Sequence, residues 1–101
     1  MNKYIFLILV LILPQTIFAQ EYKTTKDGYL AAISEEYLDK ALDLINAEDY
    51  EALQKLIGKK VVFWLKEGLK VQVVDRTWTG AIKIRPKGKL VEVWTFAEAV
   101  E

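Results

Sequence analysis

The chain offers few side chains that can carry out catalysis. It contains no histidine and no cysteine, so it lacks the commonest general base at neutral pH, the usual zinc and copper ligands and the thiol nucleophile. Ser34 is the sole serine and has no histidine to activate it. Carboxylates remain: Glu35, Asp39 and Asp43 recur every four residues. Two carboxyl groups that flank a cleft can hydrolyse a glycosidic bond.

These carboxylates are not expected to form an active site. Neighbouring acids on one face of a helix are normally solvated, and the surrounding sequence shows no loops that would form a cleft around them. The Asp-x-Asp-x-Asp-Gly spacing typical of a calcium-binding loop is also missing. We therefore predict that the chain is not an enzyme and that it uses neither a metal ion nor a cofactor.

A second set of residues is suited to binding. Lys83 and Arg85 alternate with two isoleucines, so they are expected to share the outer face of a strand. Arg76 and Trp78 fall in the loop before that strand. An aromatic ring among cations suits an acidic peptide, a glycan carboxylate or a partner protein. In the alternative, Trp78 folds over the end of the domain and the cations only face solvent.

The charges are unevenly distributed, although the formal net charge is zero. Residues 21–54 hold nine acids against three lysines, whereas residues 55–89 hold ten bases against two acids. This pattern indicates either two halves that attract each other or a basic surface aimed at an acidic partner. Nucleic acid is not expected as that partner, because the chain is predicted to be exported. Nothing in the pattern requires a dimer.

The N-terminus has the pattern of an export signal. Lys3 precedes an apolar run over residues 4–13, Pro14 interrupts it, and Ala19 is a small residue suited to the position before a cleavage site. We predict a signal peptide over residues 1–19, and a periplasmic or secreted protein with no stable membrane insertion after cleavage. The alternative is an uncleaved anchor, although a spanning helix needs about 20 consecutive apolar residues.

Residues 27–60 are predicted to form a helical hairpin after a flexible lead-in at 20–26. Apolar residues recur every three or four positions from Leu30 onward, and Asp27 can cap a helix over residues 28–46. Asp49 can cap a second helix, which Gly58 would end.

Beyond Gly58 the pattern changes to short strands at 61–66, 69–73, 81–85 and 90–94, separated by turn residues. Thr95 and Glu98 stand in capping-box spacing, which predicts a final helical turn. Trp64 and Trp94 lie in strongly apolar strands and are predicted to be core residues.

Residues 61–100 resemble the bacterial SH3-like barrel family, in which Leu-Lys-x-Gly-x-Lys-Val-x-Val precedes an Ile-Lys-Ile-Arg strand and a final strand with a tryptophan. The matching positions are Leu65, Lys66, Gly68, Lys70, Val71, Val73, Gly80, Ile82, Lys83, Ile84, Val93 and Trp94. Members that bind the cell wall often have Gly-Trp where this chain has Val93-Trp94. We predict an α+β fold with an N-terminal αα-hairpin packed on a small SH3-like β-barrel over residues 61–101.

These features predict an exported, non-enzymatic binding or adaptor module. It would recognise an envelope protein, a peptide or a cell-wall component through Arg76, Trp78, Lys83 and Arg85. A periplasmic inhibitor or immunity-type protein that blocks an exported enzyme is the alternative. The two differ in what copurifies with the chain: a single enzyme in stoichiometric amount, or wall fragments and a larger complex.

Overall fold

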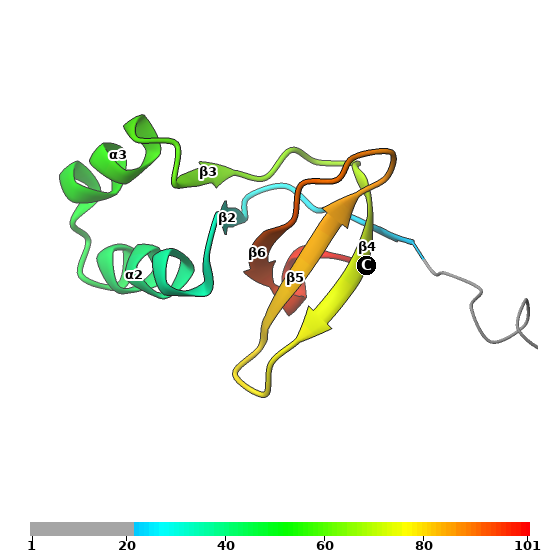
Figure 1. The fold of residues 1–101 in the computed structure, drawn as a ribbon. Helices are drawn as coiled ribbons and strands as arrows, with labels where there is room; N and C mark the ends of the chain where they lie inside the picture. Colours follow the sequence, from blue (N-terminus) through cyan, green and yellow to red (C-terminus); the bar gives the residue numbers. More distant parts are fainter. Residues whose placement is uncertain (1–21) are drawn as a thin grey trace, which may run out of the picture.

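The computed structural model describes residues 22–101, which form two helices, six strands and one 3₁₀ turn (Figure 1). Their order is β1 (Lys23–Thr24), β2 (Leu30–Ala32), α2 (Glu35–Asn46), α3 (Tyr50–Gly58), β3 (Val62–Trp64), β4 (Lys70–Arg76), β5 (Ala81–Pro86), β6 (Val93–Phe96) and η1 (Ala97–Ala99). The predicted strands after Gly58 and the final helical turn are therefore present, with shifted boundaries.

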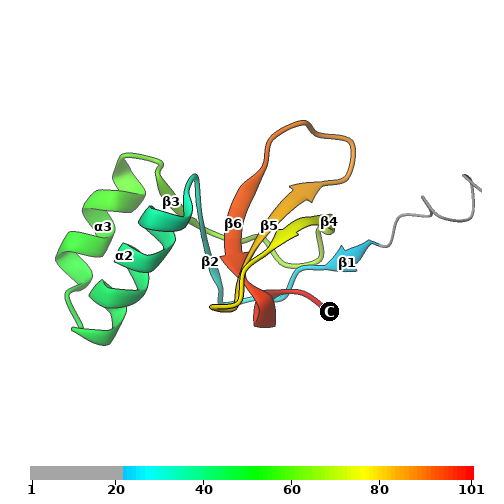
Figure 2. The ribbon, with the colours of Figure 1, turned by 60° about the horizontal axis from the view of Figure 1, so that its bottom comes forward.

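The strands form one antiparallel sheet in the order β1-β4-β5-β6-β2-β3. Residues at the C-terminus join it beside β1. The Thr24 amide donates to the Glu101 carbonyl at 2.9 Å, and the Lys26 amide donates to the Ala99 carbonyl at 2.8 Å. The first strand of the described chain is thus held between β4 and the last residues, as the second view shows (Figure 2).

The predicted fold, an N-terminal αα-hairpin on an SH3-like barrel, is wrong. The two helices follow β1 and β2 and are inserted between β2 and β3, and the six-stranded sheet is open because its end strands, β1 and β3, do not pair with each other. Two short segments explain the error. Lys23–Thr24 and Leu30–Ala32 are too short to show the alternation that identifies a strand.

The first helix begins later than the apolar spacing predicts. Gly28 has φ +87°, a left-handed conformation that interrupts a helix, and the next residues form β2. Helix α2 starts after Ser34, whose Oγ accepts a hydrogen bond from the Tyr37 amide at 3.2 Å. Ser34 is therefore an N-cap and not a mid-helix residue. Asp49 caps α3 as predicted, by accepting from the Ala52 amide.

Apolar side chains pack on both faces of the sheet. We call the face that carries Leu30, Ala32 and Ala81 the outer face; α2 and α3 cover it over β2, β3 and β6 (Figure 2). The opposite face, which carries Ala31 and Ile82, is the inner face. The inner cluster comprises Ala31, Leu65, Val71, Ile82, Ile84, Val93 and Ala99. Beyond Ala81, the helices leave the outer face of β4 and β5 uncovered (Figure 1).

One of the three tryptophans, Trp64, differs from the prediction. Trp64 was expected in the core, but it is 55% exposed because it lies on an edge strand. Trp94 is partly buried and packs against the cluster beneath the helices. Trp78 does not fold over the end of the domain, since it is 96% exposed.

The N-terminal predictions are only partly covered by the structure. The predicted signal peptide over residues 1–19 lies outside the described residues. Within the predicted lead-in at 20–26, Lys23–Thr24 form β1, and Thr25 is buried. Between Tyr22 and Glu101, no helix is long and apolar enough to cross a membrane.

Candidate functional site

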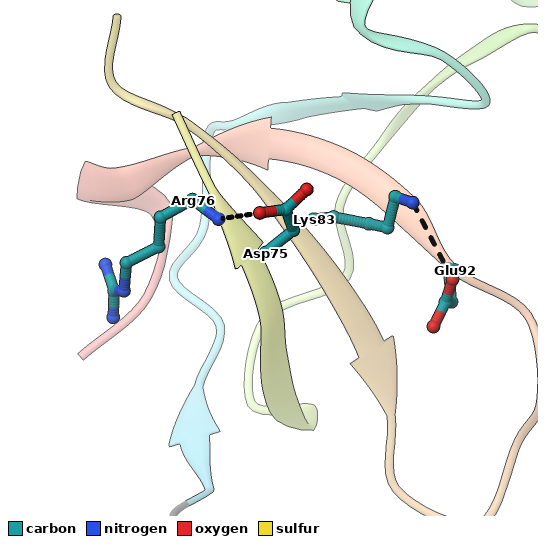
Figure 3. A network of polar contacts seen from close by, with 4 residues as sticks. All are labelled: Asp75, Arg76, Lys83 and Glu92. Atoms are coloured by element: carbon teal, nitrogen blue, oxygen red, sulfur yellow. Dashed lines mark hydrogen bonds and ion pairs between the residues drawn. The ribbon is translucent and has the colours of Figure 1, made fainter. Parts of the chain in front are cut away.

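The four residues predicted to bind a partner do not form one patch. Lys83 and Arg85 lie on the outer face, as their alternation with buried Ile82 and Ile84 predicts. Arg76 is the last residue of β4 and pairs with Ile82, so it is directed to the inner side of the sheet. Figure 3 shows the Arg76 side chain pointing away from Lys83.

A register shift in β4 explains the position of Arg76. The pairing with β5 slips between Val73 and Asp75, which leaves Val74 as an extra residue. Such a bulge moves every following side chain to the opposite face. Asp75 therefore joins Lys83 on the outer face and Arg76 leaves it. Regular alternation along β4 would have placed Arg76 beside Lys83, and nothing in the sequence marks the bulge.

Trp78 lies in the turn between β4 and β5, two residues beyond Arg76. The Thr77 hydroxyl fixes this turn, because it donates to the Ala81 carbonyl at 2.9 Å and accepts from the Ala81 amide at 3.2 Å. Gly80 supplies the left-handed conformation at φ +94°. The turn is thus held in one shape, and it presents an indole ring that is 96% exposed.

The charge of Lys83 is already balanced. Its Nζ lies 3.9 Å from Glu92 Oε1 and 5.4 Å from the centroid of the Trp94 ring (Figure 3 shows the pair with Glu92). Each contact contributes at most about 1 kcal/mol at an exposed site. Together they hold the ammonium group over β6, at the border of the part of the outer face that the helices cover.

Arg85 belongs to a different arrangement, a pocket of about 240 Å³ that we call the cationic pocket. Its guanidinium donates from Nη2 to Gln72 Oε1 at 2.7 Å, across the β4–β5 pair. The pocket is lined by Tyr22, Gln72, Arg85, Lys87, Gly88, Lys89 and Leu90. Three of these side chains are cationic and none is acidic, so the pocket has the composition of an anion-binding site.

The turn after β5 brings the lysines to Arg85. The Lys87 amide donates to the Lys70 carbonyl at 2.8 Å, and the Lys89 amide donates to the Pro86 carbonyl at 3.1 Å. Gly88 has φ +81°, which closes the turn. Lys87 Nζ also lies 5.3 Å from the centroid of the Tyr22 ring. The sequence predicts only a turn at residues 86–89, although two lysines around a glycine, the first of them two residues after Arg85, are a usable signal.

The carboxylates considered for catalysis lie elsewhere. Glu35, Asp39 and Asp43 are on α2, and Asp39 and Asp43 are exposed. None of the three lines the cationic pocket. Within residues 22–101, no group of three or more acidic, histidine or cysteine side chains is placed to hold a metal ion.

Comparisons with known proteins add no relative. No family model matches the chain, and neither the curated proteins nor the solved structures give a significant match. The resemblance of residues 61–100 to the SH3-like family therefore stays a prediction.

Proposed function

We propose that this protein is a binding module whose cationic pocket recognises an anionic group, a carboxylate or a phosphate, on an envelope protein, a peptide or a cell-wall component. The observation that carries the proposal is the convergence of Arg85, Lys87 and Lys89 on one pocket with no acid among its lining residues. The proposal includes a location outside the cytoplasm, supported by the signal-like pattern of residues 1–19.

The pocket suits recognition because its central cation is oriented before a ligand arrives. Gln72 accepts a hydrogen bond from Arg85, which fixes the guanidinium plane and leaves its other N–H groups free for a ligand. A planar guanidinium binds a carboxylate or a phosphate through two parallel hydrogen bonds. Lys87 and Lys89 add charge without a fixed direction, so the pocket would accept anions of differing shape.

The test is a titration of the exported protein, purified from expressing cells, with two probes, acetylated triglutamate and inorganic phosphate, followed by NMR chemical shifts. We expect saturable shifts of Gln72, Arg85 and Gly88. Arg85→Gln combined with Lys87→Gln should weaken binding about tenfold, because two charged hydrogen-bond donors are lost. The probe that binds more tightly identifies the preferred anion.

The matched control is Lys55→Gln combined with Lys59→Gln, which removes the same charge from the end of α3, where neither residue lines the pocket. It should leave the affinity within about twofold, since exposed charges at a distance are screened by salt. Equal losses in the two double variants, or no shift with either probe, would overturn the proposal.

A further inference from the structure

A second cavity, of about 320 Å³, adjoins the cationic pocket, and we call it the apolar groove. It is lined by Ile33, Phe63, Trp64, Leu65, Lys66, Leu69, Pro86, Lys89, Val91 and Val93. Lys89 lines both cavities, so the groove and the pocket meet at that side chain. Three of the apolar lining residues are unusually exposed: Ile33 at 53%, Trp64 at 55% and Val91 at 54%.

The groove exists because β2 leaves the sheet early. Pairing between β2 and β6 covers only Ala31 with Thr95 and Ala32 with Trp94. Ser34 then starts α2, which turns the chain away. Val91 precedes β6 and lies past the end of the pairing with β2, so no strand pairs with it on the β2 side. The space between β3 and the β5–β6 connection is therefore left open.

One wall of the groove carries backbone groups that can pair with an incoming strand. The Ile33 amide donates to Val61, and the Leu65 amide donates to Tyr29, across the β2–β3 pair. Since bonded and non-bonded positions alternate in an antiparallel pair, the N–H and C=O of Trp64 are directed away from β2. β3 is the end strand of the sheet, so these groups lie on a free edge.

The charges of the groove select the chemistry of its occupant. Its two charged lining residues are Lys66 and Lys89, and the adjoining pocket adds Arg85 and Lys87. An occupant must therefore combine apolar groups with negative charge. A strand edge beside an apolar cavity favours an extended peptide, since main-chain hydrogen bonds supply affinity and alternate side chains supply specificity.

We infer that the apolar groove binds an extended acidic peptide that pairs with the edge of β3 at Trp64. An apolar side chain of the peptide occupies the groove, and a carboxylate two residues along reaches Lys89 and the cationic pocket. In an extended strand, residues two apart point the same way and lie about 6.6 Å apart. This inference rests on the proposed function, because it names the class of ligand for the same site.

The experiment compares two fluorescent peptides of eight residues, one repeating Val-Ser-Glu-Ser and one repeating Ser-Ser-Glu-Ser, so that each glutamate follows a valine or a serine by two positions and points to the same side. They have equal length and charge. The exported protein should bind the valine peptide at least about tenfold more tightly, because only that peptide buries apolar surface in the groove. Val91→Ser should weaken binding of the valine peptide and so remove most of this preference. Val74→Ser, an exposed valine on β4 outside the groove, should change neither affinity.

The outcomes separate this inference from the function on which it rests. Equal affinities for the two peptides, with sensitivity to Arg85→Gln and Lys87→Gln, overturn the groove as a peptide site and leave the cationic pocket intact. No binding of either peptide overturns both. Tighter binding to phosphatidylglycerol vesicles than to the valine peptide, lost in Val91→Ser, identifies a lipid surface. Self-association lost in Val91→Ser identifies a second copy. Either result overturns the peptide.

Discussion

Thr25 joins the segment after β1 to the turn between β3 and β4 through one buried side chain. Its hydroxyl donates to the Lys66 carbonyl at 2.6 Å and accepts from the Leu69 amide at 2.8 Å. Its own amide and carbonyl bond to Leu69 and Gly68. The residue is 2% exposed, so none of these groups can turn to water instead. Thr25 thereby fixes the turn between β3 and β4, which forms one wall of the apolar groove.

Thr25→Val should lower the free energy of unfolding by about 1 kcal/mol or more, because it removes the hydrogen-bond partner of the Leu69 amide and the Lys66 carbonyl in a part-buried turn while keeping the side-chain shape. Urea denaturation followed by tryptophan fluorescence measures the loss. Thr25→Ser keeps the hydroxyl and should cost clearly less than the valine variant. A valine variant as stable as the natural protein would show that these hydrogen bonds contribute nothing.

At the scale of elements, alternation past Gly58 located the four later strands, and capping chemistry located α3. The alternation of apolar and polar residues failed as a guide where an element is short or irregular. The run Leu30-Ala31-Ala32 is buried on both sides, and such a run fits a helix as well as a strand. The bulge at Val74 leaves no mark in residue types, so the position of Arg76 was not predictable. The sequence shows Lys87 and Lys89 as two charges in a turn close to Arg85, but it could not show their approach to Tyr22, which depends on β1 pairing with β4.

The turn between β4 and β5 holds one residue that matters for stability and one that does not. Trp78 is 96% exposed, so Trp78→Ser should change the free energy of unfolding by less than about 0.5 kcal/mol. Gly80→Ala should cost about 1 kcal/mol or more, because φ +94° strains any side chain even though the space around it is open. Thermal unfolding of the two variants checks this contrast. A large loss in Trp78→Ser would mean that the indole packs against the protein.

The whole molecule keeps its charges apart. Seven acids lie on or between α2 and α3, whereas the cationic pocket is lined by residues of β4 and β5, strands that lie away from the helices (Figure 1). The ion pair Lys83–Glu92 lies within the sheet region, and among residues 22–101 no ion pair joins the helices to the sheet. The two halves therefore do not neutralise each other, which leaves the basic end free to attract an anionic partner from solution.

Export should leave this arrangement intact. β1 begins at Lys23, so cleavage after Ala19 would remove no residue of the described fold. We expect the intact mass of protein recovered from the periplasm or the medium to correspond to a chain starting at Gln20. Ala19→Lys, which removes the small residue required before the cleavage site, should retain the longer form. An exported natural chain that still starts at Met1 would contradict the prediction.

The pairing of β1 also has a kinetic consequence. One neighbour of β1 is β4, and the other is the segment that ends at Glu101. Both contacts close very long loops. Contacts between residues far apart in the sequence cost the most chain entropy, and this cost comes before the contacts stabilise the fold. The pairing of β1 with the C-terminal segment should therefore form last. In a chain emerging from synthesis or translocation, that edge of β1 stays unpaired until the C-terminal residues have arrived.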